Sequence, residues 1–338
     1  YLREKQLLLV LDNFEHVVDA AGVLSAILRD APNVKLIVTS RERLRLRGEQ
    51  ILEVDGMILP EVTDSVETLT QYASVQLFVQ SAHRVTPDFE VDQDNVADVA
   101  HIIRLVGGLP LGIELAAAWL EGLTIDDIAS EIEQSLDFLE TDLRDVPERH
   151  RSMRAVFDYS WRLLDDKEKT VFIKLSVFRG GFEREAAQKI AGASLRTLTT
   201  LVNKSLLRRD PKGRYLMHTL LRQFAEEQFE ADADCEEVRM QHAIYYGALI
   251  ERLGPVFNTR KEADAVDQLA EEKENLRAAL YYAIRNRLWD EVDKAHHTIL
   301  LFYIARSLLR EGVELFQWIA EELRADGQQD TDLYWSTL

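Results

Sequence analysis

The N-terminal part of the chain has the hydrophobic pattern of a parallel β-sheet with a connecting helix. Residues Gln6–Asp12 form an apolar run that ends in an acid, as expected for a central strand with both faces covered. Apolar residues then recur at helical spacing over Glu15–Arg29, and a second apolar strand follows at Val34–Thr39. Strand, helix and strand over about 35 residues predict a parallel βαβ unit. A short third strand is expected at Gln50–Val54.

From Leu69 onward the periodicity is helical, which indicates a compact four-helix bundle in residues 68–141. Glycine or proline breaks separate the expected helices, which are 69–84, 92–106, 111–120 and 125–139. The polar stretch Asp142–His150 contains a proline and is predicted to be a linker.

Residues 150–230 combine helices with a β-hairpin. Two short strands, 205–209 and 214–217, flank the turn Asp210-Pro211-Lys212-Gly213. Helices with a small hairpin are typical of a winged-helix domain. The last segment, 235–338, is helical throughout, and its helix lengths suit stacked hairpins of the tetratricopeptide kind. The expected helices there are 238–253, 262–286, 288–305 and 308–324. The predicted fold is therefore mainly α, with an α/β portion in residues 1–60.

Composition narrows the kinds of partner. The formal net charge of −19 disfavours non-specific binding to nucleic acid, and no apolar run is long enough to cross a bilayer. The single cysteine, Cys235, excludes a disulfide framework and suits a cytoplasmic setting. Four arginines at 41, 43, 45 and 47 form a basic stretch without aromatic residues, which favours a loop that faces a phosphate or another domain.

Two candidate residues follow the predicted strands. Asp12 ends the first strand, and ligands bind at the carboxyl edge of a parallel sheet, so its carboxylate suits Mg²⁺. The alternative is that Asp12 or Asn13 caps the next helix. Arg41 follows the second strand, where its planar fork suits a terminal phosphate; the alternative is a solvated loop charge.

Two more candidates lie at helix boundaries. The glycine pair Gly107-Gly108 permits close backbone approach, and Pro110 pre-sets the start of a helix, although a plain helix corner explains both. His218 closes the predicted hairpin and opens a helix. It suits either a phosphate contact or packing at a domain junction.

The order of these segments resembles one family. The stretches LLLVLDNFEHV, KLIVTSRERL, GGLPLGIELAA and MHTLLRQFAEE, spread over residues 7–227, resemble the STAND-class P-loop ATPases, including the NB-ARC group and its bacterial relatives. The stretch from Arg151 to Ala187 resembles the winged-helix region of bacterial members, and KENLRAALYYAI resembles the start of their tetratricopeptide-like repeats.

The resemblance implies roles for the candidate residues. Asp12 matches the Walker B acid that organises Mg²⁺, and Arg41 matches the sensor arginine that detects the terminal phosphate. Gly108 and Pro110 belong to the GLPL motif near the adenine. His218 matches the histidine that contacts the β-phosphate of ADP. The implied cofactors are ATP or ADP and Mg²⁺.

The sequence departs from the family pattern at three places. Asn13 stands where a second catalytic acid is frequent, with Glu15 as the candidate substitute, and Thr219 replaces the acid that follows the histidine. None of the 15 glycines is followed by lysine, so the chain has no Walker A loop. We expect that motif upstream of Tyr1. Slow ATP hydrolysis is expected of a protein that carries the motif, and not of this chain alone.

The implied function is a nucleotide-dependent signalling switch. Its C-terminal helices would sense a protein or small-molecule signal, and activation would produce a homo-oligomer or a transcriptional output. The alternative is a helical interaction scaffold without a nucleotide function. Direct DNA contact is not expected, because the candidate recognition helix, 195–204, carries only Arg196 and Lys204 as basic residues.

Overall fold

The computed structural model describes residues 1–61, 66–141, 151–257 and 259–337, and the protein is mainly helical. It divides into two compact units. Unit 1 consists of residues 1–169, 196–208 and 218–224, and unit 2 of residues 170–195, 209–217 and 225–338. Among the described helices, none combines the length and apolar character needed to cross a membrane.

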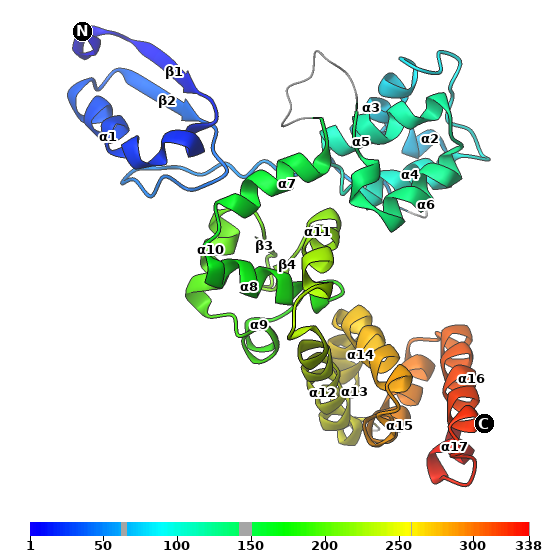
Figure 1. Cartoon of the computed structure of the whole chain (residues 1–338). Helices are drawn as coiled ribbons and strands as arrows, with labels where there is room; N and C mark the ends of the chain where they lie inside the picture. The colour runs from blue at the N-terminus through cyan, green and yellow to red at the C-terminus, as the bar shows by residue number, and fades with distance from the viewer. Residues whose placement is uncertain (62–65, 142–150, 258, 338) are drawn as a thin grey trace. The chain divides into compact units, whose positions relative to one another are not determined.

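The α/β portion of unit 1 contains the predicted parallel strand pair. Strand β1 (Leu7–Leu11) pairs with β2 (Val34–Val38), with Leu9 opposite Leu36. A 3₁₀ segment, η2 (Phe14–Ala20), and helix α1 (Ala21–Asp30) connect the strands, and Figure 1 shows α1 beside the strand pair. The small core is formed by Phe14, Ala21 and Leu24, with Leu11, Leu36, Val38, Leu44 and Leu46 packed against it.

Two strand predictions were wrong. Residues 50–54 form no strand, and Leu52 and Val54 are 87% and 89% exposed. The first strand was expected to be covered on both faces, yet Leu8 and Val10 are 57% and 63% exposed. Both failures follow from the small size of the described sheet, in which β1 has β2 as its one neighbour. Residues 50–54 have no strand to pair with in that sheet, and α1 covers one face of the strand pair, so the side chains on the other face are exposed.

The predicted helical bundle is present in unit 1. Its main helices are α3 (Ala73–Ala82), α4 (Val96–Leu105), α5 (Pro110–Ala118) and α6 (Ile125–Gln134), preceded by the short α2 (Val66–Leu69). Each main helix buries at least one large apolar side chain fully, for example Phe78, Ile102, Ile113 and Ile128. A capping box of Thr124 and Asp127 fixes the start of α6. The predicted linker, 142–150, lies outside the described residues.

The segment after residue 151 contains the predicted helices and hairpin. The helices are α7 (Met153–Arg162), α8 (Asp166–Lys174), α9 (Arg184–Ala191), α10 (Leu195–Asn203) and α11 (Thr219–Glu230). Strands β3 (Arg208–Arg209) and β4 (Tyr215–Leu216) pair as predicted but are shorter than expected. In the turn between them, the Asp210 carboxylate accepts a hydrogen bond from the Arg214 amide, and Gly213 has a φ of 88°.

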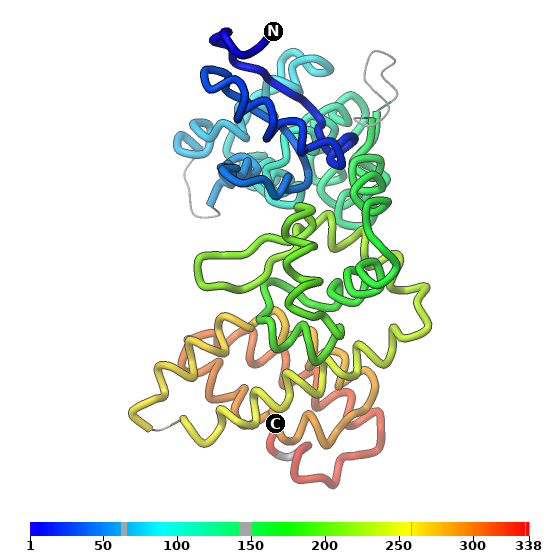
Figure 2. Tube along the Cα trace, turned by 90° about the vertical axis from the view of Figure 1, so that its left-hand side faces the viewer, coloured from blue at the N-terminus to red at the C-terminus, as the bar shows by residue number. Residues whose placement is uncertain are grey.

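The C-terminal helices belong to unit 2. They are α12 (Cys235–Leu253), α13 (Glu262–Glu271), α14 (Lys273–Arg285), α15 (Trp289–Ala305), α16 (Leu309–Ala325) and α17 (Asp332–Thr337). Figure 2 follows their winding trace in yellow to red. Short 3₁₀ turns complete the described elements: η1 (Leu2–Glu4), η3 (Trp119–Glu121), η4 (Leu136–Phe138), η6 (Leu175–Val177) and η7 (Gly254–Val256).

The single helix predicted for residues 262–286 is two helices, and this prediction was wrong. They separate at Glu272, whose φ of −101° and ψ of 7° leave the helical region. The Glu272 side chain is buried, and its carboxylate binds Arg214, Tyr246 and Asn275. These polar partners satisfy the hydrogen-bonding needs of the buried carboxylate. The sequence pattern alone predicts an exposed glutamate at this position, so it gave no sign of the helix break.

Candidate functional site

Asp12 lies at the carboxyl end of β1, held by a residue of the neighbouring strand end. The Thr39 hydroxyl donates to Oδ1 of Asp12 at 2.5 Å and accepts a hydrogen bond from the Asn13 amide at 3.0 Å. Asn13 has a φ of 59° and is the N-cap of η2, without a side-chain capping bond. Asn13 therefore occupies the N-cap position that the alternative named, but it does so without a side-chain capping bond. The Asp12 carboxylate is exposed, and one of its oxygens is oriented by Thr39.

The geometry fits a cation that takes few protein ligands. In the described part of the chain, no group of three or more His, Cys, Asp or Glu residues converges. Mg²⁺ is commonly held by one or two carboxylates, with waters and substrate phosphates as its other ligands. The exposed Asp12 carboxylate matches that mode of binding, whereas a fully protein-ligated metal has no site among the described residues.

Glu15 lies in η2, and its carboxylate is buried. Its side chain is 4% exposed, Oε1 lies 3.8 Å from Nε of Arg41, and Oε2 has no hydrogen-bond partner. A buried carboxylate oxygen without a partner is costly, so an added donor or cation beside it is favourable.

Arg41 is held mainly by helix α7 of the same unit. Its Nη1 donates to the Val156 carbonyl at 2.7 Å and to the Ser160 hydroxyl at 3.0 Å. Its guanidinium lies 5.2 Å from the centre of the Tyr159 ring. Burial raises the pKa of Tyr159, nearby Glu15 raises it further, and the charge of Arg41 opposes both. The solvated-charge alternative for Arg41 is therefore wrong.

A second cluster forms at the helix corner between α4 and α5. Gly107 and Gly108 have φ values of 59° and 68°, which glycine adopts without strain. Pro110 is exposed and starts α5, as predicted. The Gly108 carbonyl accepts a hydrogen bond from the Met57 amide at 2.8 Å. A Cβ atom on Gly108 would lie 2.3 Å from the Met57 carbonyl oxygen, so glycine is required here.

His218 packs against this corner. A Cβ atom on Gly107 would lie 1.8 Å from Nε2 of His218. The other ring nitrogen, Nδ1, accepts a hydrogen bond from the Leu220 amide at 3.2 Å, which leaves the proton of a neutral ring on Nε2. Nε2 is enclosed without a well-formed hydrogen bond. Burial lowers the pKa of His218 to about 4, against the opposing effect of the Gly107 and Val106 backbone.

All six predicted site residues lie in unit 1, and the structure gathers them into two clusters. Asp12, Glu15 and Arg41 surround the carboxyl ends of the strands, whereas Gly108 and Pro110 share the corner with His218. The segment 205–208 contacts residues near both clusters. The Ser205 hydroxyl lies 3.4 Å from the carbonyl of Arg41 in the first cluster, and Arg208 forms an ion pair at 2.8 Å with Asp55, which precedes the Met57 that binds Gly108.

Sequence reasoning missed Thr39 and the partners of Arg41. Thr39 ends the second strand, so the parallel register alone places it beside Asp12. Ser160 had no such signal, because it lies 119 residues from Arg41 in the chain. Two cavities in unit 2, near Lys273 and Arg306, were also not predicted.

No protein-family model matches the chain. It is similar to a protein of Mycobacterium tuberculosis named "Putative HTH-type transcriptional regulator", with 32% identity over 336 residues, covering 96% of this chain and 36% of that protein. It is also similar to an uncharacterized protein of the same species, with 28% identity over 250 residues, covering 70% of this chain and 61% of that protein. The chain thus spans about a third of the length of the first relative.

More distant similarity extends to plants and archaea. The "Disease resistance-like protein DSC2" of Arabidopsis thaliana is 26% identical over 230 residues, covering 66% of this chain and 17% of that protein. A solved structure of a STAND protein with a tetratricopeptide repeat sensor, from Pyrococcus horikoshii, aligns with 15% identity and a TM-score of 0.28, covering 99% of this chain and 49% of that one.

Proposed function

We propose that this chain is the regulatory core of a nucleotide-dependent signalling switch of the STAND ATPase class. The observation that carries the proposal is the packing of His218 against Gly107. The Gly107-Gly108 corner and His218, more than a hundred residues apart in the sequence, are in contact there. The ring nitrogen Nε2 of His218 is buried at this contact without a well-formed hydrogen bond. The orientation of the Asp12 carboxylate by Thr39 is the second support.

Each site residue has a role in this proposal. Asp12 would hold Mg²⁺, which when bound neutralises the charge of the nucleotide phosphates. Glu15, with its unpartnered buried oxygen, is the group placed to accept a proton or a hydrogen bond near Asp12. Gly108 and Pro110 would line the adenine side, because the glycine pair lets backbone approach the ligand closely. Because Asn13 replaces a second acid, hydrolysis would be slow.

Arg41 would act by exchanging partners. Its guanidinium donates hydrogen bonds to a carbonyl and a hydroxyl of α7, which are neutral acceptors, and lies 3.8 Å from the Glu15 carboxylate. A phosphate offers charged oxygens to the same planar fork and forms stronger, charge-assisted hydrogen bonds. A terminal phosphate would therefore draw Arg41 from Val156 and Ser160 and weaken the hold on α7.

His218 would act as the lock of the ADP-bound state. With a pKa of about 4 it is neutral near pH 7, and its Nε2–H lies beside the Gly107 and Val106 backbone without a well-formed hydrogen bond. A phosphate oxygen would be a stronger acceptor than these backbone groups. Because an anion favours the charged form of the ring, the same contact would raise the pKa of His218.

The remaining parts of the proposal concern partners. Residues 150–230 would form a winged-helix lever, and residues 235–338 would form tetratricopeptide-like helices that receive a protein or small-molecule signal. Activation would expose a surface for homo-oligomerisation in the cytoplasm. A transcriptional output would use parts of a longer protein, in keeping with the name of the M. tuberculosis relative.

The test is the assembly state of the protein with ADP or ATP and Mg²⁺, measured by light scattering after gel filtration. The wild type is expected to change its mass or shape between the two nucleotides. Asp12→Ala should lose the difference, and His218→Ala should shift toward the ATP form with either nucleotide. Asp94→Ala, which changes an exposed acid of the loop before α4, is the matched control. Identical behaviour of all four proteins would overturn the proposal.

A scaffold without a nucleotide function is the second candidate. The observation that favours it is the structural role of Arg41, which donates hydrogen bonds to Val156 and Ser160 of α7 and lies 3.8 Å from the buried Glu15 carboxylate. On this account neither nucleotide changes the stability or assembly of the protein, whereas Arg41→Met destabilises it in the same way with and without nucleotide.

A further inference from the structure

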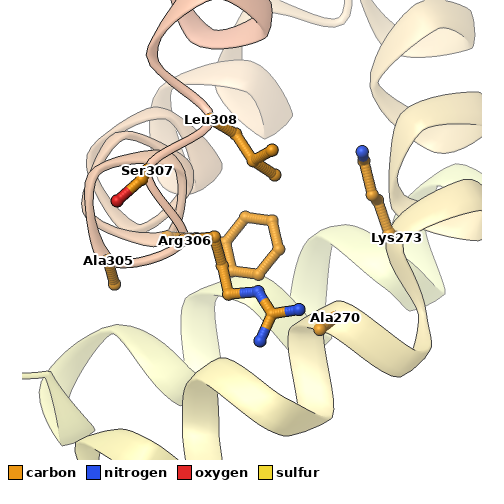
Figure 3. A pocket seen from close by; sticks show the side chains of 7 residues that line it. Ala270, Lys273, Ala305, Arg306, Ser307 and Leu308 are labelled. Carbon is orange, nitrogen blue, oxygen red and sulfur yellow. The ribbon is translucent and has the colours of Figure 1, made fainter. Parts of the chain in front are cut away.

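Two adjoining cavities lie among the C-terminal helices of unit 2. One has a volume of about 370 Å³ and the other about 280 Å³, and Lys273 and Phe302 line both. The larger volume is in the range of small-molecule sites, about 300–1,000 Å³, and the smaller one lies just below it. Figure 3 shows Lys273 on one side of the larger cavity and Arg306 and Leu308 on the other. The shared residues indicate one extended site with two compartments.

The larger compartment carries two cations, each in a partly exposed ion pair. Lys273 contacts Glu311 at 2.8 Å, and the side chains are 31% and 45% exposed. Arg306 lies 4.0 Å from Asp267, whose side chain is 77% exposed. Solvent-exposed ion pairs of this kind contribute little stability, so both cations can exchange partners at small cost. A cation pair beside a cavity attracts an anionic group, even in a chain with a net charge of −19.

The smaller compartment has aromatic and apolar side chains on its walls, together with four charged ones: Lys273, Arg277, Glu311 and Glu314. Tyr281 and Trp318 approach with ring centres 4.5 Å apart, and Leu276 and Ile299 line the same space. Such walls favour an apolar or aromatic ligand body. The two compartments therefore select different ends of one molecule.

We infer that the two compartments together bind a small organic anion, with its carboxylate or phosphate group near Lys273 and Arg306 and its apolar body against Tyr281 and Trp318. This inference rests on the proposed function in one respect only, because it names the class of signal that the C-terminal helices receive. Binding itself does not depend on a nucleotide.

The position of Lys273 connects the site to the hairpin. Lys273 and Ala270, which line the larger cavity, flank the helix break at Glu272. Glu272 forms a buried ion pair with Arg214 of the hairpin, and it also accepts hydrogen bonds from Tyr246 and Asn275. Four residues after Arg214 the chain reaches His218. A ligand that repositions Lys273 thus acts on the residue that anchors the hairpin.

The test is a calorimetric titration of the whole chain with three probes: 4-phenylbutyrate, phenyl phosphate and the neutral 4-phenylbutanol. At least one anion should bind with one-to-one stoichiometry, at least tenfold more tightly than the alcohol, and the stronger of the two identifies a carboxylate or a phosphate as the preferred head group. The double variant Lys273→Met/Arg306→Met should weaken anion binding at least tenfold. Lys189→Met, whose cation pairs with Glu185 outside both cavities, should leave it unchanged.

A second route avoids changing the charges. Leu308→Trp fills the larger cavity, keeps both cations and should abolish binding of the anions, whereas Lys273→Arg should retain it. Circular dichroism melting verifies that each variant folds. The inference is overturned if neither anion binds, if the alcohol binds as tightly as the anions, or if Leu308→Trp binds them as well as the wild type. Each of these outcomes leaves the nucleotide switch untouched, because the titration contains no nucleotide.

Discussion

Nε2 of His218 occupies the space in which any side chain at Gly107 would begin, at 1.8 Å from an ideal Cβ position. The left-handed φ of 59° at Gly107 turns the backbone so that the ring fits there. The corner between α4 and α5 and the start of α11 are thus complementary at one residue on each side, and neither residue can be replaced without an effect on the other.

Gly107→Ala is expected to lower the free energy of unfolding by about 2–4 kcal/mol, from a strained φ and the displacement of His218. Urea denaturation measures the change. Gly48→Ala has a comparable φ of 82° and open space around it, so it isolates the cost of strain. The double variant Gly107→Ala/His218→Ala should regain the part of the unfolding free energy that Gly107→Ala loses beyond the loss of Gly48→Ala. A double variant no more stable than Gly107→Ala would show that the ring is not the obstacle.

The stability of the protein should fall with acid because two histidines are buried in the neutral form. Burial lowers the pKa of His218 to about 4 and that of His242 to about 3. An unfolded histidine has a pKa of about 6.5. Below pH ~6.5 the unfolded chain binds protons that the folded chain does not, so stability is complete above that pH and is lost toward pH 4, by up to ~1.4 kcal/mol per pH unit for each residue.

Urea denaturation between pH 4.5 and 7.5 measures this dependence. His218→Gln and His242→Gln should each flatten the profile, and the double variant should flatten it further. His297→Gln serves as a control on helix α15. An unchanged slope in both single variants would contradict the assigned protonation states.

The buried pair Arg214–Glu272 should matter more than its exposed neighbour Lys212–Glu271. The side chains of the first pair are 10% and 7% exposed, and those of the second are 69% and 42% exposed. Glu272→Ala leaves Arg214 buried without its partner and should cost about 3–5 kcal/mol, whereas Glu271→Ala should cost about 0–1 kcal/mol. Thermal or urea denaturation compares the two, and equal costs would refute the structural role of the buried pair.

Arg41→Met should destabilise unit 1 by about 2–4 kcal/mol, because it removes two hydrogen bonds to α7 and leaves Glu15 buried without a cation. Arg43→Met is the matched control, since Arg43 pairs with Glu53 on an exposed surface. Urea denaturation followed by circular dichroism measures the change. If the two variants were equally stable, Arg41 would not hold α7.

Local patterns predicted most of the fold because they depend on neighbours in sequence. The apolar run before Asp12 and the helical spacing in α4 need only nearby residues, and both elements form as predicted. The absent strand at 50–54 and the break at Glu272 depend on distant partners. Residues 50–54 have no neighbouring strand in the described sheet. Glu272 forms an ion pair with Arg214, which lies 58 residues away in the sequence.

The site shows the same division. The place of Asp12 at a strand end follows from the strand itself, and the start of α5 at Pro110 follows from proline chemistry. The partners of Arg41 and the enclosure of His218 arise only from tertiary packing. Burial of that ring, which sets its protonation, is invisible in the sequence.

The most direct measurement is a calorimetric titration with ADP and Mg²⁺ of the protein that carries the expected upstream Walker A motif, in parallel with its Asp12→Ala and His218→Ala variants. The switch account predicts binding by the wild type and at least tenfold weaker binding by each variant. It also predicts a rise in the pKa of His218 on binding, measured by NMR of the imidazole ring. The absence of binding by the wild type, or equal binding by all three proteins, would contradict the account and favour the scaffold.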